Sequence, residues 1–302
     1  MKGGSPGESI TSNGIVPRVN ESPPIGRPAD IDPVGARWLA RHEARCNALF
    51  GREVRELGDG VLLFDPIDRE PFWNRLAGVG WPSSPGAFDH RLAETIALFA
   101  SLDRIPHIWP APGFDEPADL VERLLAHGFD DLGAGLLMGL DPDAAALDIA
   151  VPPDVTIERL DGGWPPPAAA DSTIEGIGDV LAEAFTIEPL HAEAIQADTR
   201  TAMTSEAFHA ILVRIGGEPA ATVRRTTFDG ASYLSSIGTR RAFRGRGLGG
   251  LVTALASRDA IAAGSRLTYL GVFVENAVAR RLYERLGFMT IGGPSPDLLL
   301  VR

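Results

Sequence analysis

Hydrophobic positions along the chain follow helical and strand spacings in two successive series. In the first series, apolar residues recur every three to four positions in some stretches and form short runs in others. The spacing predicts these elements in order: a helix over 33–50, two strands within 53–65, a helix over 89–102, a strand at 105–109, a helix over 115–127 and a strand over 132–140.

The second series begins after a polar linker at 141–148. Its first part predicts a strand, a proline loop at Pro165–Pro167, two helices and three antiparallel strands: 155–160, 178–185, 190–201, 208–215, 218–227 and 231–239. The apolar period then changes from two to 3.6. This change predicts a helix from Leu248, followed by a strand, a helix and two strands: 267–274, 277–286, 288–291 and 297–301.

The ends of the two series resemble each other. Residues 122–129 and 281–288 each combine an amphipathic helix, a glycine that ends it and a phenylalanine that begins a strand. We therefore expect an internal duplication with two similar domains, 33–143 and 153–302. Residues 1–32 are rich in Gly, Ser, Pro and Asn and lack periodicity, which is typical of a flexible leader.

Composition and charge exclude several function classes. The 302 residues include 40 acidic and 28 basic side chains, and the net charge of −12 argues against a protein that coats nucleic acid. The single cysteine, Cys46, excludes a disulfide framework, and its apolar neighbours predict a packing role. The six histidines show no metal-ligand spacing, so we predict no metal site. Without a signal-peptide pattern or a run of about 18 apolar residues, we expect a cytoplasmic protein with no membrane partner.

One segment carries most of the chemical information: Ile237-Gly-Thr-Arg-Arg-Ala-Phe-Arg-Gly-Arg-Gly-Leu-Gly-Gly-Leu251. A predicted strand runs into a turn rich in arginine and glycine, and a helix begins there. Glycines let several backbone N–H groups converge, and a helix N-terminus adds unpaired donors and a positive dipole end. The pattern therefore predicts a phosphate-binding loop. It is not a Walker loop, because no Gly-Lys-Ser/Thr follows, and a meander precedes it instead of a parallel dinucleotide-binding unit.

At these residues the sequence resembles the GNAT N-acetyltransferase superfamily. Arg244–Gly249 is similar to the family's Arg/Gln-x-x-Gly-x-Gly/Ala signature for acetyl-CoA, and Val274–Phe288 is similar to its second motif, Asn…Leu-Tyr-x-x-x-Gly-Phe. The resemblance covers about residues 153–302 and implies an α/β (α+β) fold with a mixed, mostly antiparallel sheet flanked by helices. The first domain has the Gly-Phe ending without the signature, so it resembles the degenerate copy of a tandem-GNAT arrangement.

The resemblance assigns cofactor contacts residue by residue. Main-chain groups of Ile237 and Thr239 would bind the pantetheine arm, between two strands that splay apart in the family. Asn276 would contact the cofactor, and Arg241 stands where many members have proline. Backbone amides of the loop would hold the pyrophosphate of acetyl-CoA, with the last residue at the edge: Arg244, Gly245, Arg246, Gly247, Leu248, Gly249 and Gly250.

For catalysis, the resemblance implies direct attack of an amine on the thioester in a ternary complex, without an acyl-enzyme. The amide near Ile237 would polarise the carbonyl, and Tyr283 would protonate the leaving thiolate. The alternative for Tyr283 is a buried helix tyrosine. Ser236, with Ser235, is a candidate for binding substrate or water. The sequence does not identify a general base, and the candidates by region, each with a structural alternative, are Glu183, Glu188, His191 and His209.

The predicted function is transfer of an acetyl group from acetyl-CoA to a small-molecule or peptide amine, by a monomer or homodimer. Two alternatives stay open: a non-catalytic acyl-CoA sensor or pseudoenzyme that binds a partner, and a nucleotide-binding regulatory module. An antibiotic, a polyamine, an amino acid, a mycothiol-type intermediate or a protein N-terminus would each satisfy the pattern as acceptor. Five aromatic residues are expected in the first core and the domain seam, with ligand stacking as the alternative: Phe72, Trp73, Trp81, Phe88 and Trp109.

Overall fold

The computed structural model describes residues 26–163, 170–186 and 189–301. Its first helix begins where the sequence favours a start, because the Asp32 carboxylate accepts a hydrogen bond from the Gly35 N–H at 2.8 Å and Pro33 occupies the first helical position. The elements of the first half are α1 (Pro33–Ala48), β1 (Glu53–Glu56), β2 (Val61–Phe64), β3 (Arg75–Ala77), α2 (Pro85–Ser101), β4 (His107–Trp109), α3 (Leu120–Ala126) and β5 (Asp130–Leu140).

The second half follows an irregular segment that contains the predicted linker. It includes the predicted three-stranded meander, whose strands are joined by turns at 216–217 and 229–230. Its elements are β6 (Val155–Asp161), α4 (Ala170–Ala184), α5 (Pro189–Ala202), β7 (Phe208–Ile215), β8 (Glu218–Phe228), β9 (Ala231–Thr239), α6 (Leu248–Ala262), β10 (Leu267–Phe273), α7 (Ala277–Arg285) and β11 (Phe288–Leu299).

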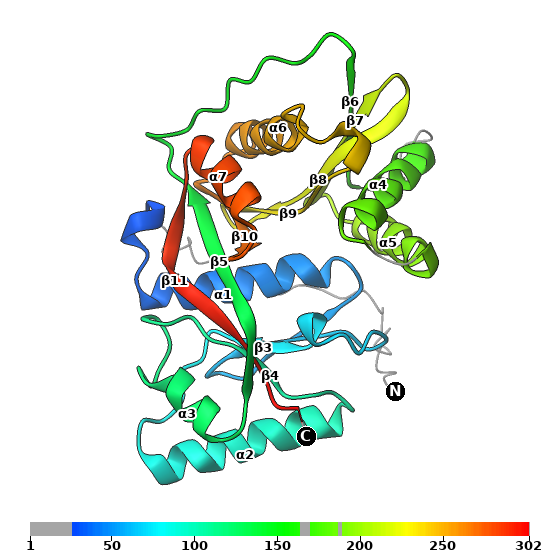
Figure 1. The fold of residues 1–302 in the computed structure, drawn as a ribbon. Helices are drawn as coiled ribbons and strands as arrows, with labels where there is room; N and C mark the ends of the chain where they lie inside the picture. The colour runs from blue at the N-terminus through cyan, green and yellow to red at the C-terminus, as the bar shows by residue number, and fades with distance from the viewer. Residues whose placement is uncertain (1–25, 164–169, 187–188, 302) are drawn as a thin grey trace, which may run out of the picture.

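All these strands belong to one 11-stranded sheet, in the order β1-β2-β3-β4-β11-β5-β10-β9-β8-β7-β6. Neighbouring strands are antiparallel except in the pairs β3–β4 and β9–β10, which are parallel. Helices cover the sheet on both faces (Figure 1). The expected fold class, a mixed and mostly antiparallel sheet flanked by helices, is therefore confirmed.

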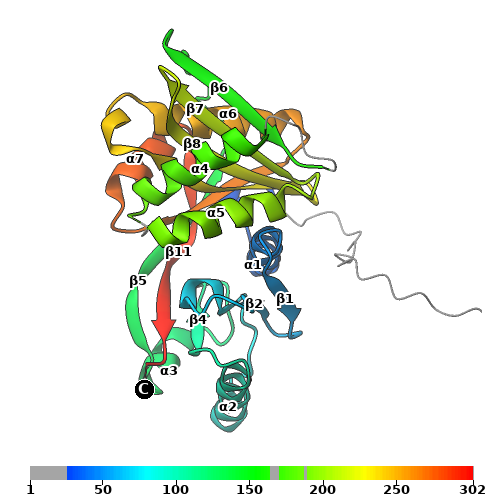
Figure 2. The same ribbon diagram turned by 90° about the vertical axis from the view of Figure 1, so that its right-hand side faces the viewer.

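The two halves repeat one arrangement of elements. The order β3-α2-β4-α3-β5 in the first half corresponds to β9-α6-β10-α7-β11 in the second, and each begins with a parallel strand pair. The strands β5 and β11 lie side by side and run through both halves (Figures 1 and 2). Because β5 lies between β11 and β10, while β11 lies between β5 and β4, each half receives a strand from the other.

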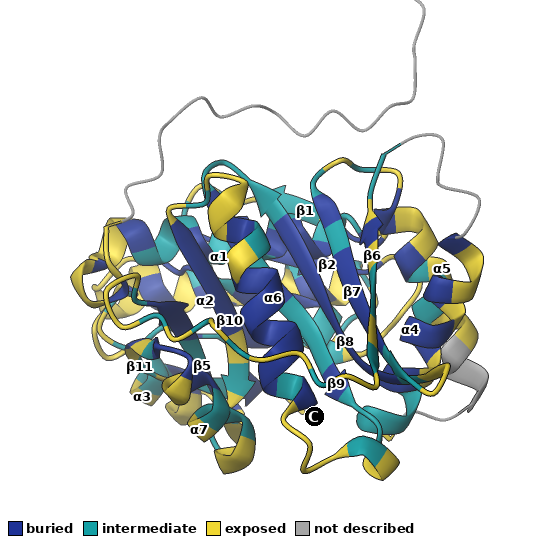
Figure 3. Ribbon diagram, turned by 90° about the horizontal axis from the view of Figure 1, so that it is seen from above, coloured by how far each residue is buried: buried dark blue, intermediate teal, exposed yellow. Residues whose placement is uncertain are grey.

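Separate apolar clusters hold the helices on the sheet. In the second half, α6 and α7 share one cluster with the sheet, and α4 and α5 share another. Most of α6 is buried (Figure 3). In the first half, α2 and α3 pack on the strands. Helix α1 contacts both halves, since Leu39 packs with Tyr269 and Ala44 packs with Val61 and Leu63.

Several boundaries differ from the predictions. The short strand β3 was not expected, and α3 begins five residues later than predicted. Helix α4 begins at Ala170, before the predicted 178, and the two predicted strands at the C-terminal end are one irregular strand, β11. The predicted loop at Pro165–Pro167 lies outside the described residues. The packing role of Cys46 is confirmed, because its side chain is buried and burial raises the pKa of the thiol.

Candidate active site

The parallel pair β9–β10 separates at one end of the sheet. Its ladder runs as far as Leu234 opposite Leu270 and stops there. Beyond this point β10 continues to pair with β5, as far as Phe273 opposite Gly135, and β9 continues to pair with β8. The facing edges of β9 and β10 therefore border an opening, which we call the β9–β10 opening.

A bulge shapes β9 where the opening begins. The register between β8 and β9 shifts between Ser235 and Gly238. Within the bulge, Ser236 has a φ of +52°, a left-handed conformation that is unfavourable for serine. Such strained residues persist only where the surrounding structure imposes them, and they are concentrated at functional sites.

The end of β9 has backbone groups that face the opening. The N–H of Arg240, just after β9, donates to the Ala220 carbonyl of β8 at 3.0 Å. Successive N–H groups of a regular strand point to opposite sides, so that of Thr239 is directed away from β8, while Ile237 lies within the bulge. The Thr239 N–H thus has the orientation that hydrogen bonds to a ligand arm in the opening require.

The predicted phosphate loop follows β9 and is exposed to solvent. Gly245 and Gly247 have φ values of +78° and +76°, and a Cβ at either position would meet no atom within 4 Å. Gly247 is the N-cap of α6, and no side chain caps this helix. The first N–H groups of α6 are thus open to an external anion, and the helix dipole favours one there.

The acid Glu183 of α4 fastens the start of this loop. Its carboxylate accepts hydrogen bonds from the Arg240 guanidinium and from the Arg241 N–H, each at 2.7 Å. The Arg240 guanidinium, followed by the Arg241 N–H, lowers the pKa of Glu183. A carboxylate held in this way positions the loop and is a poor proton acceptor.

The other two arginines lie along the loop itself. The Arg244 Nε donates to the Thr239 carbonyl at 3.1 Å, which folds this side chain back over the end of β9. Arg246 pairs with Asp154 at 2.6 Å and lowers the pKa of that carboxyl. Both arginines are exposed, so they contribute positive charge around the N-terminus of α6.

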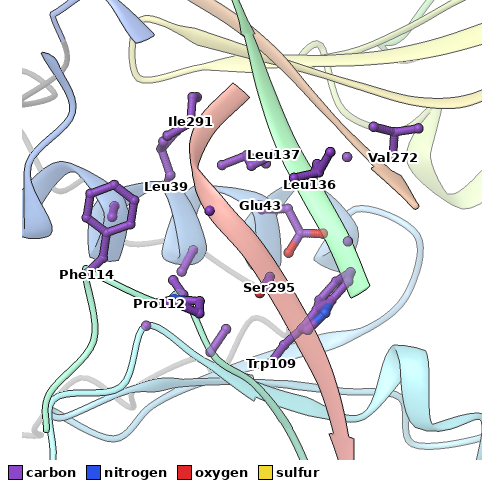
Figure 4. Close-up of a pocket in the computed structure, with 18 of the residues that line it drawn as sticks. Leu39, Glu43, Trp109, Pro112, Phe114, Leu136, Leu137, Val272, Ile291 and Ser295 are labelled. Carbon is purple, nitrogen blue, oxygen red and sulfur yellow. The ribbon is translucent and has the colours of Figure 1, made fainter. Parts of the chain in front are cut away.

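A pocket of about 200 Å³ adjoins the opening, on the side of the sheet that α1 covers. Tyr233 and Gly271, on either side of the last β9–β10 ladder pair, both line it. Other walls come from α1, β5, β11 and the loop after β4, as Figure 4 shows. Both halves of the molecule therefore build this pocket, mainly from apolar side chains such as Leu39, Phe114, Leu137 and Val272.

One carboxylate stands in this apolar surrounding. Glu43 of α1 lies among the labelled residues of Figure 4, and its side chain is 15% exposed. Nη2 of Arg75 donates to its two carboxylate oxygens at 2.6 and 2.9 Å, and Nδ2 of Asn47 donates to one of them at 2.8 Å. The Arg75 guanidinium is 1% exposed and lies 4.5 Å from the ring centroids of Phe72 and Trp109.

Comparison with known families finds one match, which lies in the second half of the chain. Residues 175–288 match the model of the acetyltransferase (GNAT) family, and this range contains the β9–β10 opening and the phosphate loop. Over these residues the chain is similar to the GNAT superfamily. None of the curated proteins matches it.

Solved structures of GNAT proteins share the fold over both halves. A GCN5-related N-acetyltransferase from Kribbella flavida is 22% identical, covers 88% of this chain and 96% of its own, and has a TM-score of 0.64. One from Sphaerobacter thermophilus is 19% identical over 90% and 93%, with a TM-score of 0.57. A tandem GNAT protein from the clavulanic acid biosynthesis pathway is 16% identical over 81% and 80%, with a TM-score of 0.59.

The residues of the second GNAT motif have clear local roles. Asn276 is the N-cap of α7, and its side chain accepts a hydrogen bond from the Ala279 N–H at 3.2 Å. Tyr283 of α7 is 6% exposed and packs in the cluster beneath α6 and α7, 6.1 Å from the Phe288 ring. Burial raises the pKa of Tyr283, so its hydroxyl stays protonated at neutral pH.

The general-base candidates do not meet at the pocket. Glu183 is engaged by Arg240, and His209 of β7 pairs with Asp161 of the edge strand β6 at 2.8 Å. Neither lines the pocket. The side chain of His191 and the residue Glu188 lie outside the described part of the chain.

The structure adds pocket residues that the sequence pattern did not single out. Glu43 and Tyr233 line the pocket, and of the five aromatic residues considered, Phe72 and Trp109 line it while Trp81 and Phe88 belong to the first core. Within the described ranges, no cluster of His, Cys, Asp and Glu is suited to a metal ion. No helix in the same ranges has the length and apolar character of a membrane span.

Proposed function

We propose that this protein is an acyl-CoA-dependent N-acyltransferase that moves an acetyl group from acetyl-CoA to an amine by direct attack. The observation that supports it most is the continuity of three features. The phosphate loop at Arg244–Gly250 follows β9, the β9–β10 opening lies at the end of that strand, and the pocket adjoins the opening at Tyr233 and Gly271.

The loop suits the pyrophosphate of CoA. Gly245 and Gly247 leave free space where a side chain would project, and the N–H groups that begin α6 lack a capping side chain. In this proposal, the backbone of Arg244–Gly249 holds the phosphates, with Gly250 at the edge, and the main chain of Ile237 and Thr239 holds the pantetheine arm. Asn276 contacts the cofactor near the start of α7.

The bound thioester supplies the electrophilic carbonyl, and this chain supplies orientation and proton management. The Ile237 N–H, in the bulge at the edge of the opening, donates to the carbonyl oxygen. Ser236 in the bulge orients substrate or water there. The Tyr283 hydroxyl, which is protonated at neutral pH, donates its proton to the departing sulfur and is reprotonated from solvent. The buried Cys46 thiol has a raised pKa and does not line the pocket, so a thiol acyl-enzyme is not part of this proposal.

The first half has a supporting role in this proposal. Residues 33–143 form a degenerate GNAT domain beside the catalytic domain at 153–302, without the glycine signature at the position that precedes α2. Their contribution is a wall of the acceptor pocket, through α1 and the loop that contains Phe114.

The test is thiol release from acetyl-CoA across a panel of amines, with CoA affinity measured separately by calorimetry. The double variant Arg244→Ala/Gly247→Ala is expected to lose CoA binding and thiol release together. Normal CoA binding by this variant would refute the cofactor assignment. Tight CoA binding by the unmodified protein, with no thiol release for any amine, would favour a non-catalytic acyl-CoA sensor.

A further inference from the structure

The pocket beside the β9–β10 opening has an unusual charge pattern. Within the described part of the chain, Glu43 is the only charged residue among those that line it. The remaining walls are aliphatic or aromatic, apart from the hydroxyl groups of Tyr233 and Ser295. Ser295 uses its hydroxyl to donate to the Pro110 carbonyl, so it holds β11 to the loop after β4.

Hydrogen bonds from neighbouring side chains hold the Glu43 carboxylate in place. Arg75 and Asn47 contact it from behind, and Arg75 is itself enclosed between the rings of Phe72 and Trp109. The carboxylate accepts hydrogen bonds from Arg75 and Asn47, and the Tyr233 hydroxyl contacts it from the side of the pocket. Because Arg75 is 1% exposed while Glu43 is 15% exposed, the group that reaches the pocket is the acceptor and not the cation.

The carboxylate is also close to the place where the pocket meets the opening. After burial, the Glu43 charge is the next largest cause of the raised pKa of Tyr233. The Tyr233 hydroxyl lies 3.7 Å from the position that a Cβ on Gly271 would occupy. Glu43, Tyr233 and Gly271 therefore lie near one another in the pocket lining, and the other lining side chains are mainly apolar.

We propose that this pocket binds the acceptor as a small primary monoamine with an aromatic or branched apolar body, and that Glu43 binds its ammonium group. The inference rests on the proposed function, since it names the substrate class of that site. A hydrogen-bonded carboxylate attracts an ammonium group, and apolar walls favour an apolar body. With its ammonium at Glu43, the acceptor would present its nitrogen near the β9–β10 opening, where the ammonium loses a proton to solvent before the neutral amine attacks.

The same chemistry discriminates against other amines. A polyamine or amino sugar would bury further ammonium or hydroxyl groups against apolar walls, with no second carboxylate among the lining residues described. An α-amino acid would place its own carboxylate beside Glu43, and no lining cation is present to receive it. The pocket of about 200 Å³ also favours a small molecule over a folded partner.

The experiment is calorimetry with the full chain and four probes: 2-phenylethylamine, 2-phenylethanol, spermidine and phenylalanine. We expect 2-phenylethylamine to bind at least about tenfold more tightly than the other three, because the alcohol lacks the ionic hydrogen bond and the other two amines bury additional charged groups against apolar walls. Equal binding of the amine and the alcohol would overturn the proposal. So would binding of spermidine or phenylalanine as tight as that of the amine.

Variants test whether Glu43 is the group responsible. Glu43→Gln is expected to remove the preference for the amine over the alcohol, and Glu43→Asp to retain most of it. The matched control is Glu56→Gln. Glu56 of β1 forms an exposed ion pair with Arg41, which lies on α1 with Glu43, and its loss is expected to leave the preference unchanged. A preference that survives in Glu43→Gln would contradict the assignment. If Glu43→Gln does not fold, the four-probe comparison on the unmodified protein and on Glu43→Asp still tests whether Glu43 binds the ammonium group.

CoA affinity, measured on the same samples, separates this inference from the proposed function. Loss of the amine preference with intact CoA binding and amine acetylation would reject the Glu43 assignment alone. Absence of CoA binding in the unmodified protein would reject the proposed function, whatever the amine results.

Discussion

Leu298 of β11 lies opposite Ile108 of β4, and both side chains are fully buried. The two residues are 190 positions apart, and the strand that carries Leu298 is the last of the chain. On its other side, Leu298 is opposite Asp131 of β5. The C-terminal strand therefore completes the core of the first half, while β5 completes the second.

This exchange predicts that the two halves unfold together. Leu298→Ala removes a buried side chain from the cluster under α2 and α3, and we expect it to lower the free energy of unfolding by about 2–5 kcal/mol. Because β5 and β11 are shared, the loss is expected in a single transition. Urea unfolding followed by both circular dichroism and tryptophan fluorescence measures it. The control is Val278→Ala, which truncates a side chain that is 72% exposed. Separate transitions for the two signals would contradict the prediction.

A second prediction concerns Asp115, in the loop beside the pocket. Its Oδ2 accepts a hydrogen bond from the Ala111 N–H at 2.7 Å, while its buried Oδ1 has no hydrogen-bond partner among the described residues. Burial raises the pKa of Asp115 from 3.8 to about 7. The folded state therefore binds more protons than the unfolded state between these values, and stability falls as the pH rises from about 4 to about 7.

The variant Asp115→Asn tests this assignment. An amide can keep its oxygen at the Ala111 N–H and cannot ionise, so the variant is expected to be more stable than the unmodified protein at pH 8, by a few kcal/mol. The two proteins are expected to be similar in stability near pH 4. Thermal unfolding at several pH values provides the measurement, and parallel pH profiles for the two proteins would show that Asp115 does not titrate in this range.

The third prediction concerns His42, which is expected to give the opposite trend of stability with pH in the acidic range. It is buried between Trp38 and Phe228, with Nδ1 2.7 Å from the Tyr269 hydroxyl. Burial lowers the pKa of His42 from 6.5 to about 4. The unfolded chain takes up a proton first, so the stability that His42 contributes is present above pH 6.5 and is lost as the pH falls towards 4. His42→Gln is expected to show a smaller loss of unfolding free energy between pH 7 and 5. An equal loss would assign the acid sensitivity to other groups.

The features that the sequence predicted well depend on neighbours along the chain. The meander, α6 and the glycine loop between them each follow from local periodicity and turn residues, and their bounds agree closely with the structure. The similarity between 122–129 and 281–288 likewise marks the two equivalent helix–strand units. This similarity carries no information on the order of the strands in the sheet, so the exchange of β5 and β11 was not predicted.

The boundaries that were missed have tertiary causes. The helix predicted from 178 begins at Ala170, and a Cβ on Gly176 would lie 2.6 Å from Leu212 and one on Gly178 would lie 2.8 Å from Gln196. These glycines allow close packing of the helix. At the C-terminal end, where two strands were predicted, β11 continues through the glycines and prolines between them, with irregularities in its pairing with β5.

Glu43 could not be recognised as a pocket residue from its pattern. An acidic residue on an amphipathic helix normally lies on the solvated face. Its partner Arg75 is 32 positions away, on the three-residue strand β3 that the sequence did not reveal. Only the packing of α1 across the middle of the sheet brings Glu43, Tyr233 and the β9–β10 opening together.

The phosphate loop allows a matched pair of glycine substitutions. Gly247 and Gly264 lie at opposite ends of α6, with φ values of +76° and +84°, and a Cβ at either would meet nothing within 4 Å. Replacement by alanine imposes a similar backbone cost of about 1 kcal/mol at both. Only Gly247→Ala adds a methyl group to the proposed phosphate cradle, so we expect it to weaken CoA binding at least about tenfold, while Gly264→Ala does not. Calorimetry with CoA measures both, and equal affinities would place the pyrophosphate elsewhere.

The last prediction separates two roles of Tyr283. If its hydroxyl donates a proton to the departing sulfur, Tyr283→Phe lowers kcat by about 10²–10⁴-fold and leaves CoA affinity nearly unchanged, because the ring still fills its site near Phe288. A packing role predicts the reverse, with a loss of stability and little change in kcat. The control is Tyr269→Phe, which removes another buried hydroxyl, the one 2.7 Å from His42 Nδ1. Steady-state kinetics with acetyl-CoA and a responsive amine, together with CoA calorimetry, distinguishes the two roles. Losses of similar size in turnover and affinity would indicate that Tyr283 supports the cofactor site instead of the proton transfer.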